Sequence, residues 1–232
     1  MGRAFAVVGT DTGVGKTIVC AGLLLSYIKT DRAAIVQKWV STGDPFGFSE
    51  DVKFCLDAAG IDLNYFPLVS KQLVNPYSFV YPASPHYAAK VHRKRIDIRR
   101  IKYACQELVS IMDTVIVEGI GGVGVPITER VLLIDLISDF KLPTVVVVKN
   151  VLGAINHTLL TVEALRKKEI SIIGLIFNDA YECNIDVKKD NVRIIKRITK
   201  LKILGQLPYM ANLRDYKEVF DKLRREIDKR LL

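Results

Sequence analysis

The feature that most constrains the fold is a glycine-rich segment, Gly9–Thr17, placed between two apolar stretches. The run Ala4–Val8 before it has the length and composition of a buried strand, and the stretch after it has those of a helix reaching about Lys29. Glycines in such a turn let backbone N–H groups point inward at an anion, and the helix N-terminus adds the positive end of its dipole. The segment therefore predicts a phosphate-binding loop.

The loop ends in Gly15-Lys16-Thr17, the ending of a P-loop. Its lysine is expected to reach the β- and γ-phosphates of a nucleotide, and its threonine hydroxyl to be a ligand of Mg²⁺. The spacing departs from the strict motif, because Thr10 stands where that motif has glycine. The alternative is an ordinary glycine-rich turn, but the strand before and the helix after favour a nucleotide site. Further nucleotide contacts are expected from Gly13, Val14 and Ile18.

Apolar strands alternate with helical patterns along the rest of the chain. Further strands are expected at 33–38, 114–117, 144–148, 171–177 and 202–205, and helices at 52–59, 98–112, 132–140, 154–168, 187–199 and 213–230. Strands rich in Val and Ile between helices predict an α/β fold with a mostly parallel sheet and helices on both faces, here of the P-loop NTPase type. The 232 residues contain no linker or repeat, so one domain, 1–232, is expected. Residues 61–86, with four prolines, are expected to form a long irregular functional loop.

The chain is basic, with a formal net charge of +9. The cations are densest at 93–100, 188–202 and 224–230, which also have helical spacing. Such stretches are usually solvated helix faces, so no nucleic-acid partner is expected, although a positive field helps to attract a nucleotide. The longest apolar run near the middle, 142–148, is strand-sized, and the N-terminal run is too short for a signal peptide. A cytoplasmic protein without a membrane partner is therefore expected.

The cysteines and histidines do not have the spacing of a zinc site. We expect each cysteine to be a small buried hydrophobe, as in a reducing compartment. The residues concerned are Cys20, Cys55, Cys105, Cys183, His86, His92 and His157.

A carboxylate and a lysine end two of the other predicted strands. Glu118 follows the strand at 114–117 and is followed by three nearby glycines, so it is well placed to hold Mg²⁺. Lys38 ends the strand at 33–38 and would point into the same crevice, because ligands of parallel sheets bind at the carboxyl ends of the strands. Asp51, at the start of a helix, offers a second acid. The alternatives are a solvated glutamate, a surface lysine and an ordinary helix N-cap.

Seven segments, in order along the chain, resemble the dethiobiotin synthase family. The similarity spans residues 4 to about 210. The Ser-Pro-His and Gly-x-Ile-Asn-His segments, together with Lys38, make the similarity specific to this family, because the phosphate loop alone occurs in many families. Trp39 stands where a proline is frequent in the family, and Thr42 where serine is more frequent. The segments are Gly9–Thr17, Lys38–Gly43, Asn75–Phe79, Pro82–His86, Val117–Gly122, Leu152–His157 and Asn178-Asp179.

The resemblance implies an enzyme of biotin biosynthesis that uses ATP and Mg²⁺ to close a cyclic urea on 7,8-diaminononanoate. One amine of this diamine captures CO₂ as a carbamate, and a carbamate oxygen takes the γ-phosphoryl group of ATP. The second amine then attacks the carbamic–phosphoric anhydride, which closes the ring and releases phosphate. The resemblance also implies a homodimer with the substrate site at its interface.

The resemblance assigns roles to individual residues as well. Lys16 and Lys38 are expected to be catalytic. The expected metal ligands are Thr17, Asp51 and Glu118. The expected nucleotide contacts, besides the phosphate loop and the metal ligands, are Gly119, Gly121, Asn178, Asp179, Leu207, Pro208 and Tyr209. The expected substrate contacts are Thr12, Lys38, Thr42 and Gly121, with Ala154, Ile155 and Asn156 holding the distant carboxylate.

Two residues outside these sets have open interpretations. His157 is expected to pack on or cap the helix at 154–168 rather than to bind the substrate. In the segment 180–191, Tyr181 is the one tyrosine available for a contact to a partner subunit.

Two other classes of protein share this type of phosphate loop. Partitioning and septum-site ATPases of the ParA and MinD type carry a lysine near the start of the loop, whereas this chain has Thr10-Asp11-Thr12 there. Cobyrinate amidating enzymes need an additional glutaminase domain, for which 232 residues leave no room. The ParA/MinD-like switch remains the main alternative.

Overall fold

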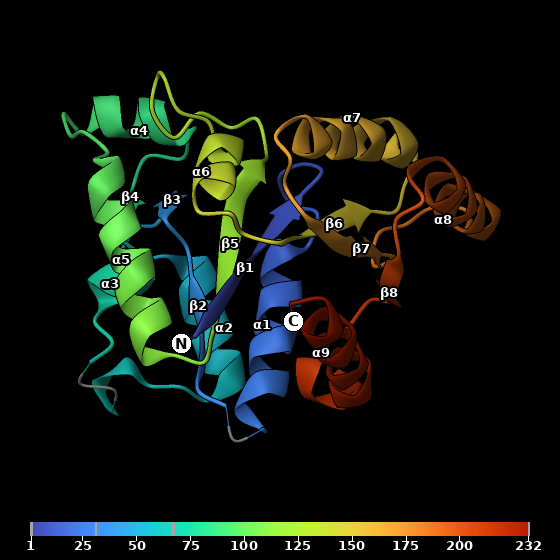
Figure 1. Cartoon of the computed structure of the whole chain (residues 1–232), viewed down its shortest axis with the longest axis horizontal. Helices are drawn as coiled ribbons and strands as arrows, with labels where there is room; N and C mark the ends of the chain where they lie inside the picture. The colour runs from blue at the N-terminus through green and yellow to red at the C-terminus, as the bar shows by residue number, and fades with distance from the viewer. Residues whose placement is uncertain (1, 31, 66–67, 232) are drawn as a thin grey trace.

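The computed structural model describes residues 2–30, 32–65 and 68–231 (Figure 1). Its centre is a six-stranded sheet in the order β2–β5–β1–β6–β7–β8, in which every neighbouring pair is parallel. The prediction of a parallel sheet with intervening helices is confirmed. The strands are β1 (Arg3–Gly9), β2 (Ala34–Gln37), β5 (Thr114–Gly122), β6 (Thr144–Lys149), β7 (Ile172–Asn178) and β8 (Ile203–Leu207).

Helices cover both faces of this sheet (Figure 1). On one face, α1 (Lys16–Ile28) packs between α2 (Glu50–Ala59) and α9 (Lys217–Leu231). The helices α5 (Ile98–Ile111), α6 (Leu133–Asp139) and α7 (Ala154–Lys167) contact β5 and β6 from the other face. The helix α8 (Ile185–Thr199) lies beside α7.

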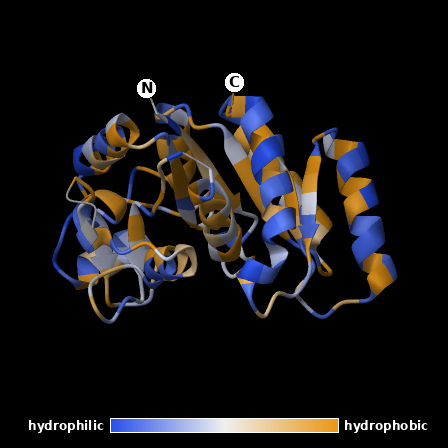
Figure 2. Cartoon of the chain, turned by 90° about the horizontal axis from the view of Figure 1, so that it is seen from below, coloured by the Kyte–Doolittle hydropathy of each residue, from blue (hydrophilic) through white to orange (hydrophobic). Residues whose placement is uncertain are grey.

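In Figure 2 the central strands are coloured mostly as hydrophobic, whereas the outer helices alternate between hydrophobic and hydrophilic stretches. Val145–Val148 of β6 have no exposed surface at all, because helices lie above and below them. Such continuous burial explains why these strands appear in the sequence as uninterrupted Val and Ile runs rather than as alternating patterns.

The helix that carries Asp51 has clear start and stop residues. The Ser49 side chain accepts a hydrogen bond from the backbone N–H of Val52, which caps the N-terminus of α2. Gly60 ends the helix with a φ of 70°, a left-handed conformation that costs glycine little. The predicted end of this helix at residue 59 is confirmed.

The prediction of an irregular loop over residues 61–86 is wrong for much of that segment. It contains η1 (Leu63–Tyr65), α3 (Lys71–Val74) and β4 (Tyr77–Phe79), while residues 66 and 67 lie outside the described part. The strand β4 pairs in parallel with β3 (Val40–Thr42) in a second, two-stranded sheet. A further helix, α4 (Pro85–Val91), follows. These elements have only three to seven residues, too few for a hydrophobic period to emerge.

One prediction about a single side chain is also wrong. Cys183 is only partly buried, whereas the other three cysteines are buried as expected. His157 is exposed in the first turn of α7, with its ring beside Gly153, and its expected packing on that helix stays a prediction. No helix among the described residues is both long enough and apolar enough to cross a membrane.

Candidate active site

The phosphate loop follows β1, which lies between β5 and β6. The sheet extends in both directions from β1, and ligands of parallel sheets bind where the strand order diverges in this way. Within the loop, Gly13 and Gly15 have φ angles of 66° and 100°. A Cβ at Gly15 would also lie 2.2 Å from the Nδ2 atom of Asn178, so both the backbone conformation and the available space require glycine there.

Lys16 is buried at the start of α1 and bonds to backbone carbonyls. Its Nζ donates to the carbonyl of Gly121 at 2.9 Å and to that of Asp11 at 3.0 Å. Burial lowers the pKa of Lys16, an effect that the nearby carboxylate of Glu118 opposes. A bound phosphate would offer this ammonium charged oxygens in place of neutral carbonyls.

Lys38 directly follows β2 and turns toward the phosphate loop. Its side chain is 6% exposed and forms ion pairs with Glu118, at 2.9 Å, and with Asp51. Burial by itself would lower the pKa of Lys38, but the carboxylates of Glu118 and Asp51 outweigh burial and raise it above its ordinary value. The lysine is therefore positively charged at neutral pH, and it is not the surface lysine of the alternative interpretation.

Thr17 joins the same two carboxylates. Its Oγ1 atom lies 2.9 Å from Oε1 of Glu118 and 3.0 Å from Oδ1 of Asp51. Burial raises the pKa of Asp51, but the ammonium of Lys38 has the opposite effect and the net result is a lowered pKa. Three segments far apart in the sequence thus bring one hydroxyl and two carboxylates together beside the phosphate loop.

These oxygens fit a magnesium ion. Glu118 is 2% exposed, and its Oε2 atom is buried without any hydrogen-bond partner in the described structure. A buried, unpaired carboxylate oxygen is costly unless a cation satisfies it. The described residues contain no group of three or more His, Cys, Asp or Glu side chains able to hold a metal. Mg²⁺ commonly takes one or two carboxylates and completes its six ligands with water and phosphate oxygens, so the small set here suits it.

These side chains surround one hollow of about 330 Å³. Its wall is formed by both lysines, both carboxylates and Thr17, together with Thr12 and Thr42 from the predicted substrate set. Ile120, which the sequence did not single out, lines it too. The hollow thus combines cations, hydroxyls and metal-type ligands at the carboxyl ends of β1, β2 and β5.

Comparison with known proteins identifies the family. Residues 3–217 match the family model described as "AAA domain". The ATP-dependent dethiobiotin synthetase BioD of Thermodesulfovibrio yellowstonii is 35% identical over 230 residues, which cover 92% of this chain and 91% of that protein. The protein of the same name from Nitrosospira multiformis is 36% identical over 95% of this chain and 96% of its own length. The chain belongs to the dethiobiotin synthetase family.

Solved structures of more distant proteins share the fold of this dethiobiotin synthetase family member. The septum site-determining protein MinD of Pyrococcus horikoshii, solved with Mg-ADP, superposes with a TM-score of 0.62, 15% identity and coverage of 99% of this chain and 97% of its own. A ParA family ATPase of Chlorobium tepidum gives a TM-score of 0.56 at 16% identity over 100% of this chain and 99% of that protein. At these identities the likeness extends to the fold alone.

Several residues expected from the family resemblance lie outside the 330 Å³ hollow. Ala154, Ile155 and Asn156 begin α7, which follows β6, and of these only Asn156 is exposed. Leu207, at the end of β8, accepts a hydrogen bond from the N–H of Asp179 at 2.7 Å, and Tyr209 is 71% exposed. The proposed contacts of these residues to the substrate carboxylate and to the base stay predictions.

The end of β7 and the loop after it have a role in this family member that the sequence did not reveal. The Asn178 carboxamide donates to the carbonyl of Val14 at 2.9 Å and accepts from the N–H of Ala180 at 3.1 Å. The Tyr181 hydroxyl donates to the carbonyl of Gly13 in the same chain. Both side chains therefore fix the backbone of the phosphate loop. The sequence predicts Asn178 as a nucleotide contact and gives Tyr181 as the tyrosine available to a partner subunit, and it does not show that β7 ends beside this loop.

Proposed function

We propose that this chain, as one α/β domain, catalyses the ATP- and Mg²⁺-dependent conversion of 7,8-diaminononanoate and CO₂ to dethiobiotin. The observation that carries this proposal is the convergence of Lys16 and Lys38 on one hollow beside two carboxylates. A nucleotide switch of the ParA or MinD type carries its second lysine near the start of the phosphate loop, whereas Lys38 here follows β2. A second buried cation suits an enzyme that brings another anion up to the γ-phosphate.

The chemical problem is repulsion between two anions. The carbamate and the γ-phosphoryl group must approach to about 3–3.5 Å for a carbamate oxygen to attack phosphorus. Lys16 neutralises the phosphate side, and Lys38 is the cation available for the carbamate side. In a site that excludes water, each charge has a larger effect than it has in bulk solvent.

Lys38 shares its carboxylates with the proposed metal site. If Glu118 and Asp51 held the metal, their ion pairs to Lys38 would weaken, and the ammonium would be available to the anions beside it. Mg²⁺, when bound, neutralises and orients the phosphate oxygens. In the absence of substrates the same ion pairs keep the ammonium and the carboxylates neutralised.

The phosphoryl transfer and the ring closure need no reactant besides ATP and the carbamate of the diamine. The carbamate oxygen forms a bond to γ-phosphorus while the bond to the β,γ-bridging oxygen breaks and ADP leaves. The second amine then attacks the carbamate carbon, loses a proton and expels phosphate, which carries away the carbamate oxygen. Thr12 and Thr42, which line the hollow, supply hydroxyls for the diamine or carbamate.

The distant carboxylate of the substrate needs a separate anchor. We propose the start of α7 at Ala154, Ile155 and Asn156, where the positive end of the helix dipole favours an anion, although the N–H of Ala154 donates to the carbonyl of Val151. This segment lies outside the hollow that holds the two lysines. A homodimer with its substrate site at the interface would complete the pocket.

A ParA- or MinD-like switch is the second candidate, favoured by the shared fold. Such ATPases carry a lysine near the start of the phosphate loop, where this chain has Asp11. The Asp11 side chain accepts a hydrogen bond from the N–H of Thr12 at 2.7 Å, so it stabilises the loop locally. The sequence similarity to dethiobiotin synthetases, at 35% identity over 92% of the chain, makes the switch the weaker candidate.

Phosphate release tests the proposal. The purified chain is incubated with ATP, Mg²⁺ and bicarbonate, with and without 7,8-diaminononanoate, and phosphate is measured together with dethiobiotin. We expect release to rise at least about tenfold with the diamine, with one dethiobiotin formed per phosphate, because the phosphoryl acceptor is the carbamate. A ParA-like ATPase would release phosphate at the same rate whether or not the diamine is present.

A further inference from the structure

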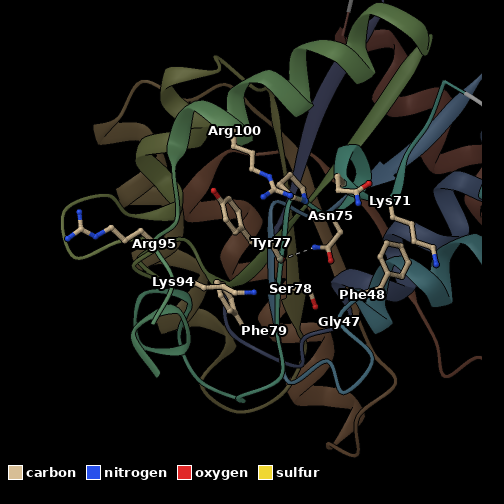
Figure 3. Close-up of a pocket in the computed structure, with 12 residues that line it drawn as sticks. Gly47, Phe48, Lys71, Asn75, Tyr77, Ser78, Phe79, Lys94, Arg95 and Arg100 are labelled. Atoms are coloured by element: carbon tan, nitrogen blue, oxygen red, sulfur yellow. Dashed lines mark hydrogen bonds between the residues drawn. The ribbon is translucent and has the colours of Figure 1, made fainter. Parts of the chain in front are cut away.

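Asn75 lies behind Lys38, between α3 and β4. Its side chain is buried, at 6% exposure, and it forms part of the wall of a second hollow, of about 520 Å³. Figure 3 shows this hollow, with the Asn75 carboxamide turned toward the backbone beside Tyr77. The two hollows share no lining residue, so Asn75 is separate from the groups proposed to touch substrates.

Both the nitrogen and the oxygen of the Asn75 carboxamide form hydrogen bonds. Its Nδ2 donates to the carbonyl of Lys38 at 2.8 Å and to that of Tyr77 at 3.1 Å. Its Oδ1 accepts from the backbone N–H of Ser49 at 3.1 Å. These partners fix the orientation of the amide, because the reversed one would face N–H against N–H and oxygen against two carbonyls.

These contacts link the two segments that form the Lys38–Asp51 ion pair. Lys38 is held by its carbonyl, through Asn75, and by its N–H, which donates to the carbonyl of Val74 at 2.8 Å. Ser49 is the N-cap of α2, and Asp51 follows it by two residues. One buried side chain therefore connects the backbone of the lysine to the start of the helix that carries its partner carboxylate.

We infer that Asn75 is a positioning residue for the phosphoryl transfer, which sets the distance between the Lys38 ammonium and the Asp51 carboxylate. The inference rests on the proposed function. A displacement of about 1 Å in a reacting group can cost about 100-fold in rate, and long side chains hold their place only when the supporting contacts are fixed. Asn75 touches neither nucleotide-binding residues of the phosphate loop nor the 330 Å³ hollow, so it acts through the two charged groups.

Gln37 provides a matched control. It is also a fully buried carboxamide, and its Nε2 donates to the carbonyl of Leu73 at 2.7 Å while its Oε1 accepts from Trp39 at 3.0 Å. It thus joins the same two stretches of chain as Asn75 does, 37–39 and 73–75. Its recorded side-chain hydrogen bonds do not extend to α2, so its loss weakens the packing without releasing the helix that carries Asp51.

The test compares Asn75→Ala, Asn75→Asp and Gln37→Ala with the wild-type chain. For each we measure kcat for diamine-dependent phosphate release, Kd for ADP, Tm, and the affinity for Mn²⁺ with ADP by electron paramagnetic resonance. We expect both Asn75 variants to lose at least about 30-fold in kcat and to bind Mn²⁺ more weakly, with Kd for ADP within about twofold. We expect Gln37→Ala to lower Tm comparably but to keep kcat and Mn²⁺ affinity within about threefold.

The outcomes separate this inference from the proposed function. If the wild-type chain releases no phosphate in response to the diamine, the proposed function fails, whatever Asn75 does. If the wild type responds and a folded Asn75 variant keeps its kcat, or Gln37→Ala loses as much kcat as the Asn75 variants, the inference is overturned. Asn75→Asp differs from the native residue in a single group, so it carries the test if Asn75→Ala does not fold.

Discussion

Replacing Lys38 with methionine is expected to lower kcat for diamine-dependent phosphate release by roughly 1,000-fold, while Kd for ADP stays within about threefold. Methionine keeps much of the length of the side chain but removes the buried cation. The ammonium interacts with Glu118 and Asp51 rather than with the phosphate-loop backbone, so nucleotide binding has other sources. The affinity for Mn²⁺ in the presence of ADP should rise, because the two carboxylates lose a competing cation and repel each other more strongly.

The control for this variant is Lys53→Met, which removes an exposed lysine on the same helix as Asp51. It should leave both kcat and Mn²⁺ affinity close to the wild-type values. Equal losses of kcat and ADP affinity in Lys38→Met would contradict the catalytic role, because they would place the lysine in nucleotide binding. Unchanged Mn²⁺ affinity would contradict the claim that Lys38 and the metal share the carboxylates of Glu118 and Asp51.

Replacing Lys16 with alanine is expected to weaken nucleotide binding itself. Truncating a buried ammonium that pairs with phosphate costs about 2–5 kcal/mol of binding free energy. Kd for ATP should therefore rise by at least about 30-fold. The ammonium is positioned for this by its bonds to the carbonyl of Asp11, within the phosphate loop, and to that of Gly121, near the end of β5. Isothermal titration with ATP and Mg²⁺ measures the change.

A matched variant is Lys29→Ala, at the other end of the same helix, where the lysine is exposed. It should bind ATP as the wild-type chain does. Wild-type affinity in Lys16→Ala would refute the assignment of Gly9–Thr17 as the phosphate loop, and with it the nucleotide site.

The sequence predicts the phosphate loop and the two other strand ends because each depends on local order along the chain. A strand, a glycine-rich turn and a helix start occur within Arg3–Ile28, and the burial of β5 and β2 is visible as apolar runs that end at Glu118 and Lys38. In a parallel sheet all carboxyl ends meet at one edge. Those two facts bring Lys16, Lys38 and Glu118 together without any tertiary information.

The position of Asp51 could not be derived in this way. It begins a helix that reaches the site only through tertiary contacts, in which the Asn75 side chain bonds to Ser49 and the Asp44 carboxylate accepts from the N–H of Glu50 at 3.1 Å. Asp44 and Asn75 read in the sequence as residues of loops, because β3 and β4 beside them have three residues each. The sequence therefore predicted Asp51 as a metal ligand without predicting what holds it there.

Trp39 illustrates a departure from the family that the structure accommodates. The indole is 2% exposed, donates to Oε1 of Gln37 at 3.0 Å and packs against Phe140 with ring centroids 4.9 Å apart. Its polar atom is satisfied and its ring is in the core, so the residue that replaces the frequent proline leaves Lys38 pointing into the hollow. The packing of Trp39 against Phe140 joins residues far apart in the sequence, so it could not be predicted from the sequence.

The fate of one oxygen atom tests the central claim, that the γ-phosphoryl group is transferred to a carbamate. The reaction is started with ¹⁸O-labelled CO₂ in unlabelled water, with ATP, Mg²⁺ and the diamine, and stopped before the label exchanges with solvent. Mass spectrometry of the released phosphate should then find one ¹⁸O atom per phosphate. Phosphate whose new oxygen comes from water would mean that the chain only hydrolyses ATP, and the account would be contradicted.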